Sequence, residues 1–279
     1  MNFKKGYMVA RKSYNKDIIF VIDKIIKRKN NIDYAILKGL TIRIKADAPV
    51  DDLELVSKQE VERSLSLLED TIRKRAQNLS VLQNNIKSKS LKRYRELIYK
   101  GKILHLDGDR RYMEKSTRYY RQLGLNAVVK NISESRQYIV VKRLLERYKP
   151  DILIITGHDS MIKDKTEYNN IYNYRNSKYF IKTVNEAREW EADMNKLVIF
   201  AGACQSYFEA IMMAGANFAS SPGRILIDFV DPLIVAEKVA TTERNKIVTI
   251  NQITKELREG GASIGGTSAE GKLEKIIIK

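Results

Sequence analysis

Cysteine and histidine are nearly missing from this chain. Its 279 residues include one cysteine, Cys204, and two histidines, His105 and His158. A single cysteine cannot form an intrachain disulfide, which favours a reducing cytoplasm as the location. So few thiols and imidazoles also argue against a structural zinc site. We therefore expect no metal and a fold that depends on its apolar core.

Other common signatures are absent as well. The sequence has no Walker loop and no dinucleotide-binding glycine pattern, so no nucleotide cofactor is predicted. No apolar run approaches the length needed to cross a membrane. The N-terminus lacks the apolar core of a signal peptide. These absences together predict a cytoplasmic protein with no cofactor and no membrane partner.

Positive charge, by contrast, is abundant. The formal net charge is +17, from 51 Lys and Arg against 34 Asp and Glu. Residues 71–102 alone hold ten basic residues and one acid, Glu96. Such a run could bind a polyanion, but a solvated helical face is the interpretation we favour. A basic run between two domains would also be open to a protease that cuts after arginine or lysine.

The first hundred residues divide into two parts. Residues 1–56 are rich in β-branched residues and turn signals, which predicts a small SH3-like or KOW-like β-barrel that binds a ligand or caps the fold. Residues 57–100 change to helical spacing and predict a basic helical linker, with Ser57 and Glu60 as a capping box. The expected strands lie near 6–11, 17–25, 33–39 and 40–46.

Residues 101–279 alternate between strand and helix patterns. Nearly all-apolar strands in such an alternation predict an α/β domain with a parallel sheet covered on both faces. Strands are expected at 102–109, 126–131, 151–155, 197–201 and 225–230, with a closing strand at 273–278. Helices are expected at 112–123, 133–148, 184–194 and 207–214.

Cys204 and His158 follow two of these strands. Because parallel strands end at one shared crevice, both side chains should meet there. They lie 46 positions apart, close to the spacing of histidine and cysteine in caspase-type peptidases. An imidazole beside a thiol makes a nucleophile, and the helix start after Cys204 favours a thiolate. The alternatives are a buried structural cysteine and a loop histidine. His105, inside a strand, is interpreted as structural.

Several motifs resemble one peptidase family. The stretches Leu104–Asp109, Thr156–Asp159 and Ala201–Ser206, together with the first 14 residues, are similar to the YabG family of sporulation-specific cysteine proteases. The resemblance covers nearly the whole chain. It implies a caspase-like three-layer fold and an endopeptidase of the mother cell that processes spore-coat and cortex proteins. It also implies cutting after arginine, self-cleavage, and His158 and Cys204 as the catalytic pair.

Two positions depart from the wider caspase-like pattern. Asp159 follows the histidine where a glycine is usual, although its amide could still serve an oxyanion hole. Gly202 stands where arginine-specific members often carry an acid. The acid that binds arginine must then come from elsewhere, and Asp107 and Asp109 are the first choices. Asp159 is also assigned to substrate binding, and Asp228 and Asp231 are further choices that could equally cap turns.

The sequence thus predicts a cysteine endopeptidase acting on spore-coat and cortex proteins, with nucleic acid as a disfavoured partner. A second hypothesis remains beside it. A basic, non-catalytic scaffold, with a barrel that binds nucleic acid or coat components, would also explain the charge. Thiol reactivity and cleavage assays distinguish the two.

Overall fold

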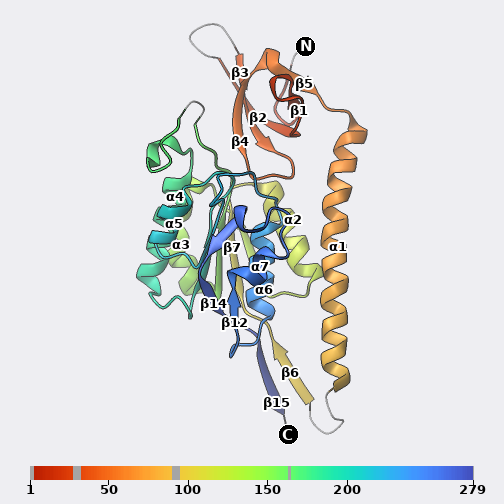
Figure 1. Ribbon diagram of the computed structural model, residues 1–279, viewed down its shortest axis with the longest axis vertical. Helices are drawn as coiled ribbons and strands as arrows, with labels where there is room; N and C mark the ends of the chain where they lie inside the picture. The colour runs from red at the N-terminus through yellow and green to blue at the C-terminus, as the bar shows by residue number, and fades with distance from the viewer. Residues whose placement is uncertain (1–2, 28–32, 90–94, 163–164, 279) are drawn as a thin grey trace.

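The molecule combines an antiparallel N-terminal sheet, a long helix and an α/β layer structure (Figure 1). The computed structural model describes residues 3–27, 33–89, 95–162 and 165–278. Within those ranges no helix is both long and apolar enough to cross a bilayer.

The N-terminal sheet has five antiparallel strands in the order β4-β3-β2-β1-β5. Its core holds Val9, Phe20 and Leu37, which are fully buried. β4 and β5 form the edges of the sheet, and the predicted SH3-like closure stays a prediction. The strands are β1 (Met8–Arg11), β2 (Phe20–Lys27), β3 (Asp33–Gly39), β4 (Lys45–Pro49) and β5 (Leu53–Leu55).

The strand predicted at 40–46 is wrong in its first half. β4 begins only at Lys45, and residues 40–44 leave the N-terminal sheet. Ile42 instead bridges to Asp228, and Ile44 bridges to Asp159 in the α/β part. The apolar alternation of this stretch is satisfied by a distant part of the chain, which local sequence cannot reveal.

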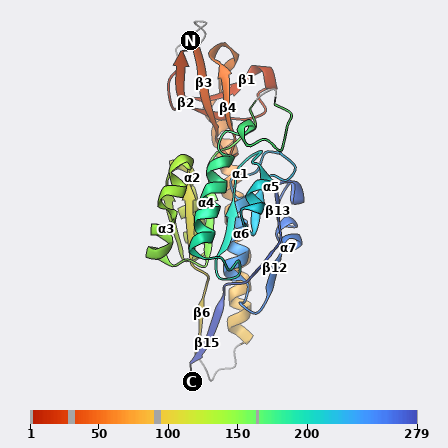
Figure 2. The same cartoon turned by 90° about the vertical axis from the view of Figure 1, so that its left-hand side faces the viewer.

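The linker is a helix followed by a strand. Helix α1 (Lys58–Lys89) starts with the predicted capping box, in which the Glu60 amide donates to the Ser57 hydroxyl at 3.2 Å. A helix continuing to residue 99 is wrong, because β6 (Arg95–Tyr99) pairs with β15 (Glu274–Ile278). The predicted closing strand therefore exists, but it forms a separate ribbon at the bottom of the molecule (Figure 2).

The central sheet confirms the predicted parallel α/β arrangement. Its order is β13-β11-β10-β9-β7-β8, and neighbouring strands from β8 to β11 are parallel. β13 runs antiparallel at one edge. The strands are β7 (Ile103–Asp107), β8 (Ala127–Asn131), β9 (Ile152–Thr156), β10 (Val198–Ala201), β11 (Phe218–Ser220) and β13 (Ile264–Gly266).

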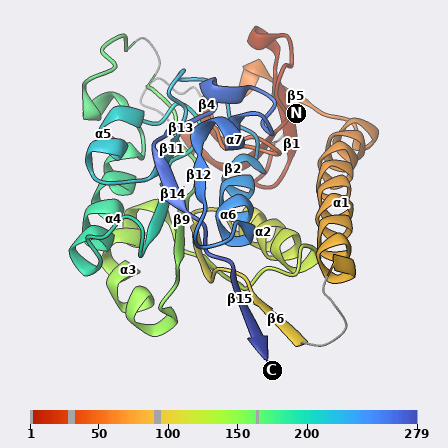
Figure 3. The ribbon, with the colours of Figure 1, turned by 60° about the horizontal axis from the view of Figure 1, so that its bottom comes forward.

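Helices cover both faces of this sheet (Figure 3). On one side, alternate strand residues such as Leu104 and Ile155 pack against α3 (Glu134–Tyr148), α4 (Ser177–Trp190) and α5 (Phe208–Met213). On the other side, Ile103 and Ile154 pack against α2 (Arg110–Gln122), α6 (Asp231–Thr241) and α7 (Ile250–Thr254). A small ribbon of β12 (Ile247–Thr249) and β14 (Ser268–Glu270) adjoins α7 in the chain.

The strand predicted at 225–230 is wrong. β11, at Phe218–Ser220, takes the fifth parallel position instead. Residues 225–230 form an irregular segment in which Ile227 and Phe229 are fully buried. Their burial explains the apolar pattern, and the backbone of this segment pairs with residues 41–43 rather than with the sheet.

Candidate active site

His158 and Cys204 lie beyond the carboxyl ends of two paired strands. β9 and β10 are direct neighbours, with Ile155 opposite Ala201 in the register. This confirms the predicted adjacency of the two strand ends. Both side chains are fully buried. The N-terminal sheet sits over this end of the central sheet, as Figures 1 and 2 show.

One carbonyl oxygen lies between the two loops. The amide of Asp159 donates to the carbonyl of Arg43 at 3.3 Å, and the amide of Cys204 donates to the same oxygen at 3.4 Å. A pair of convergent amides beside a potential nucleophile is the geometry of an oxyanion hole. The two amides therefore lie where the predicted oxyanion hole would need them.

The side chain of Arg43 enters the protein interior. Its Nη1 lies 2.8 Å from Oδ2 of Asp107, and both side chains are inaccessible to solvent. The guanidinium also faces the rings of Tyr112, at 4.8 Å, and Phe229, at 5.2 Å. Its Nε and Nη2 have no hydrogen-bond partner in the described part of the chain.

Asp107 is held in its ionised form. Burial alone would raise the pKa of this carboxyl, but the Arg43 guanidinium and the His105 ring, 3.6 Å away, hold the pKa well below its usual range. His105 also bonds Thr156 at 2.7 Å and Tyr120 at 3.1 Å through its two ring nitrogens. The structural role predicted for His105 agrees with these partners.

The thiol of Cys204 contacts the backbone of Ile227. The Ile227 amide donates to Sγ at 3.2 Å, and Sγ lies 3.7 Å from the Ile227 carbonyl. Burial raises the pKa of the thiol well above its usual range, although the amide bond partly opposes this. The cysteine is therefore a neutral thiol in this conformation, and a thiolate requires greater hydration or a charged partner.

The imidazole of His158 stacks on Tyr112, with ring centroids 5.1 Å apart. Neither ring nitrogen has a hydrogen-bond partner among the residues that the structure describes. Burial lowers the pKa of His158 to about 3, and the Asp109 carboxylate, 3.8 Å from Nε2, opposes this only in part. His158 is therefore neutral at pH 7, and burial makes it a weak base in this conformation.

The carboxylates of Asp109 and Asp159 bind groups of this chain. Asp109 caps α2 through the Arg111 amide at 2.8 Å and also pairs with the Arg111 guanidinium. Asp159 accepts hydrogen bonds from the hydroxyls of Ser177, at 2.5 Å, and Ser206, at 3.0 Å. Burial raises the pKa of Asp159 to about 6 despite these bonds. Its backbone amide, rather than its carboxylate, faces the Arg43 carbonyl.

Glu134 supports the histidine loop and was not identified from the sequence. Its carboxylate accepts the His158 amide at 2.8 Å. A Cβ added at Gly108 or Gly157 would come within 2.3 Å of this carboxylate, so both glycines leave space for it. In sequence, Glu134 looks like an ordinary acid in the first turn of a helix. Ser133, expected to open α3, makes no side-chain capping bond.

Position 202 has no room for an acidic side chain that could bind arginine. It has a φ of +117°, and a Cβ there would lie 2.2 Å from the Ser220 hydroxyl. Asp228 lies 3.6 Å from Arg258, and Asp231 accepts the Asp228 amide at 3.2 Å, which fits the turn-capping alternative. Within the described ranges, no cluster of three or more His, Cys, Asp or Glu side chains is arranged to hold a metal.

The fold and the site define a class of protein. A thiol and an imidazole follow neighbouring parallel strands of an α/β fold, and two amides converge there on one peptide carbonyl, which defines a candidate enzyme site at the carboxyl edge of the sheet. Residues 4–277 match the family described as YabG peptidase U57. The chain is also 35% identical, over 288 aligned positions, to the sporulation-specific protease YabG of Bacillus subtilis (strain 168). That alignment covers 98% of the chain and 97% of the relative.

The chain therefore belongs to the YabG peptidase family. No solved structure matches it. Family membership supports peptidase activity, and hence protein substrates, over the basic scaffold that the charge alone would also allow.

Proposed function

We propose that this protein is a cysteine endopeptidase of sporulating cells that cuts after arginine in spore-coat and cortex proteins. The observation that carries the proposal is the convergence of the Asp159 and Cys204 amides on one peptide carbonyl. The similarity to a sporulation-specific protease supports the cellular setting. We further propose that it acts in the mother cell, at the forming coat.

In the proposed reaction Cys204 is the nucleophile and His158 the general base and acid. His158 takes the thiol proton, and Sγ attacks the carbonyl carbon of the residue before the cut. The amides of Asp159 and Cys204 stabilise the oxyanion. His158 then gives its proton to the departing amine, leaving a thioester. A water molecule, deprotonated by His158, hydrolyses the thioester and regenerates the thiol.

Specificity for arginine is assigned to Asp107. Its carboxylate pairs with a guanidinium at 2.8 Å and is ionised, as an arginine-binding acid requires. The Asp109 carboxylate lies 3.8 Å from Nε2 of His158, and we propose that it stabilises the imidazolium that forms during the reaction. Asp159 contributes its amide. Direct substrate contacts by the carboxylates of Asp109 and Asp159 remain predictions.

Self-cleavage in the basic segment 71–102 is a further part of the proposal. Arg73 is exposed on α1 and paired with Asp70, so a protease could reach it once the helix unwinds locally. Residues 90–94 of the segment lie outside the described residues. Incubated wild-type protein should acquire new N-termini in 71–102, whereas Cys204→Ala should stay intact. Intact wild-type protein would contradict this proposal.

The decisive experiment is cleavage of a peptide library by wild type, Cys204→Ala and His158→Ala in parallel. Wild type should cut after arginine, and both variants should lose activity by a factor of at least about 10³, because nucleophile and base act as a unit. Circular dichroism and thermal melting should show that both variants remain folded. Undiminished cleavage by folded Cys204→Ala would exclude a cysteine mechanism. Salt-dependent nucleic-acid binding without thiol reactivity would favour the scaffold alternative.

A further inference from the structure

Residues 41–45, which connect β3 to the start of β4, pass through the candidate active site and form isolated bridges at Ile42 and Ile44. The Phe229 amide donates to the Thr41 carbonyl at 3.0 Å, and the Arg43 amide donates to the Ile227 carbonyl at 3.5 Å. The Lys45 amide donates to the Asp159 carbonyl at 3.3 Å. The backbone of this segment is thus paired with two loops of the α/β part, much as a peptide ligand pairs its backbone with a protein edge.

The register of the segment places a single residue at the reacting position. The Arg43 carbonyl receives the amides of Asp159 and Cys204, and the bond to Ile44 follows it. The Arg43 side chain simultaneously fills the interior pocket that ends at Asp107. Carbonyl and side chain therefore occupy the two sites that a bound substrate would need for its arginine.

We propose that residues 41–45 are a tethered competitor of the active site, bound in the manner of a substrate with Arg43 as the residue before the cut. This inference rests on the proposed function, since it concerns the same site. It assigns the arginine pocket to Tyr112 and Phe229 in addition to Asp107. The described conformation is therefore self-inhibited. A protein substrate can enter the active site only after residues 41–45 have left it.

The pocket chemistry explains why the competitor carries arginine. A planar guanidinium can face the rings of Tyr112 and Phe229 while one edge pairs with Asp107. Two of its nitrogens, Nε and Nη2, are buried without partners in the described residues. Unpaired buried donors lower the affinity of the pocket for Arg43, which makes release of the segment easier.

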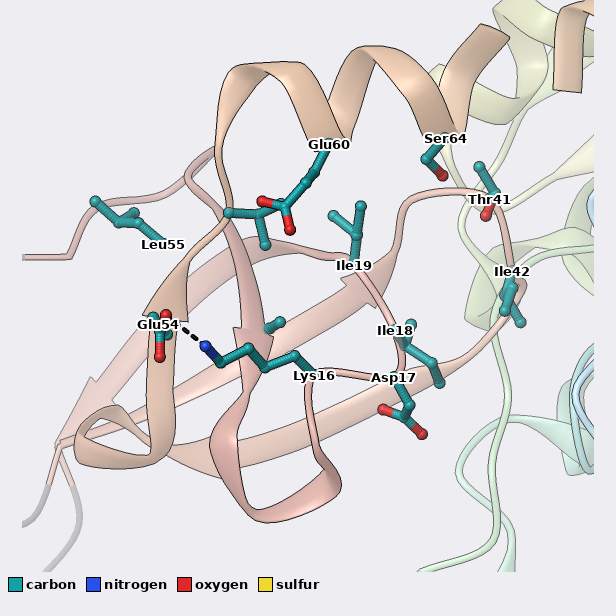
Figure 4. Close-up of a pocket in the computed structure, with 12 residues that line it drawn as sticks. Lys16, Asp17, Ile18, Ile19, Thr41, Ile42, Glu54, Leu55, Glu60 and Ser64 are labelled. Atoms are coloured by element: carbon teal, nitrogen blue, oxygen red, sulfur yellow. Dashed lines mark hydrogen bonds and ion pairs between the residues drawn. The ribbon is translucent and has the colours of Figure 1, made fainter. Parts of the chain in front are cut away.

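The segment is anchored just outside the cleft. The Tyr112 hydroxyl lies 2.8 Å from the carbonyls of both Gly39 and Ile42, and Nζ of Lys115 donates to the Leu40 carbonyl at 3.3 Å. On its outer side, Thr41 contributes to a pocket of about 340 Å³ between the N-terminal sheet and α1 (Figure 4). These contacts add to the backbone bonds and the Arg43 ion pair that hold the segment, while Thr41 and Ile42 stay partly exposed.

Occupancy also explains the protonation of the catalytic pair. With Arg43 bound, Cys204 and His158 are fully buried and carry no charge. Departure of the segment would admit water, which lowers the pKa of the thiol and raises that of the imidazole. Release and activation are thereby the same event.

The test measures access to Cys204 with an affinity label. The probe is acetyl-Leu-Thr-Ile-Arg chloromethyl ketone, whose peptide reproduces residues 40–43. The Cys204 thiol gives its proton to His158 and then to solvent, and the resulting thiolate displaces chloride to form a thioether. Labelling rates are followed by intact mass in wild type, Arg43→Ala and Arg43→Lys. Lys16→Ala, which removes a charge from the exposed Lys16–Glu54 pair, is the matched control.

Folded Arg43→Ala should be labelled at least tenfold faster than wild type, because the competitor no longer fills the pocket. Arg43→Lys should fall between the two, and Lys16→Ala should match wild type. Equal or slower labelling of folded Arg43→Ala and Arg43→Lys would overturn the proposal. If Arg43→Ala is unstable, because Asp107 is left unpaired, the result for Arg43→Lys decides.

A second measurement separates this inference from the proposed function. Ethylguanidinium should raise the melting temperature of Arg43→Ala in a Cys204→Ala background, and leave Cys204→Ala alone unchanged. The pocket is thereby tested without catalysis. In Arg43→Ala it should also slow labelling by the arginine ketone while sparing labelling by iodoacetamide. If ethylguanidinium slows labelling by neither reagent, the pocket that holds Arg43 is not the pocket that binds the arginine of a substrate beside Cys204. If Cys204 resists both reagents in every variant, the cysteine mechanism fails instead.

Discussion

Arg43 and Asp107 form a fully buried ion pair across 64 positions of the chain, with Nη1 and Oδ2 separated by 2.8 Å. Arg43 belongs to the segment between two strands of the N-terminal sheet, and Asp107 ends β7 in the central sheet. The pair therefore joins the two sheets at the candidate active site. Removing either charge leaves the other buried and unpaired, a change that typically costs 3–5 kcal/mol of stability.

Asp107→Asn should separate arginine specificity from general peptidase activity. The amide keeps the shape of the side chain but loses the charge that pairs with a guanidinium. We expect kcat/KM for an arginine peptide to fall by about 100-fold, and the ratio of arginine to glutamine cleavage to fall with it. Steady-state kinetics on matched peptides measures both values.

The control for this variant is Asp17→Asn, which makes the same charge change at an exposed carboxylate. It should retain wild-type specificity. An unchanged arginine preference in folded Asp107→Asn would show that another acid recognises the substrate. Asp109 would then be examined next, because it is the other carboxylate close to His158.

Tyr112→Phe should loosen the segment while keeping the ring that faces the guanidinium. The lost hydroxyl shares its one proton between the carbonyls of Gly39 and Ile42, and a hydrogen bond of this kind contributes about 1 kcal/mol, with a further cost for the acceptor left unpaired. We expect a fall in the free energy of unfolding of about 1–2 kcal/mol and faster alkylation of Cys204. Denaturant titration and intact mass report the two effects. Slower alkylation would speak against a restraining role for the hydroxyl.

Glu134 should act as a positioning residue for the histidine loop. Glu134→Ala removes the acceptor of the His158 amide and leaves that donor without its partner. We expect kcat to fall at least tenfold with little change in KM, because Glu134 acts through the backbone of the histidine loop. Glu134→Gln keeps an acceptor oxygen and should restore most of the loss. A purely structural role would lower stability in both variants and leave kcat of the folded protein unchanged.

The sequence was a reliable guide to many local elements, although the helix expected at 184–194 spans Ser177–Trp190 and helix α6 was not predicted. The apolar runs ending near Thr156 and Ala201 became neighbouring parallel strands, and Ser57 with Glu60 formed the expected capping box. Because parallel strands share one carboxyl edge, the meeting of the His158 and Cys204 loops followed from those runs. The family resemblance, confirmed over nearly the whole chain, added the protease assignment.

Pairing between segments that are distant in the sequence could not be predicted. Residues 40–46 and 225–230 each have the alternation of a strand, and each was assigned to its local sheet. In the structure, Arg43 and Ile227 pair with one another instead. Apolar periodicity reports that a segment is buried and extended, but not which partner it finds. Local sequence does not distinguish Arg43 from a surface charge, since arginine is rarely buried without a partner and Asp107 is 64 positions away.

The buried histidine makes a distinctive contribution to the pH dependence of stability. The pKa of His158 is lowered to about 3, below the value of about 6.5 expected in the unfolded chain. Between these values the unfolded state binds a proton that the folded state does not. Stability must therefore fall as the pH drops from about 6.5 toward about 3, with a loss of about 2 kcal/mol at pH 5. Asp159 acts in the opposite sense, since its pKa is raised to about 6 and its folded form takes up a proton first.

Comparing two variants isolates the histidine from Asp159 and from the other buried groups. Denaturant unfolding of Cys204→Ala and of Cys204→Ala with His158→Ala, at pH 7.5 and pH 5, avoids self-cleavage. Between the two pH values, the single variant should lose about 2 kcal/mol more stability than the double variant, because only it retains the imidazole. Identical pH dependence would mean that His158 is solvated and titrates normally in the folded protein. The segment carrying Arg43 would then spend most of its time outside the cleft.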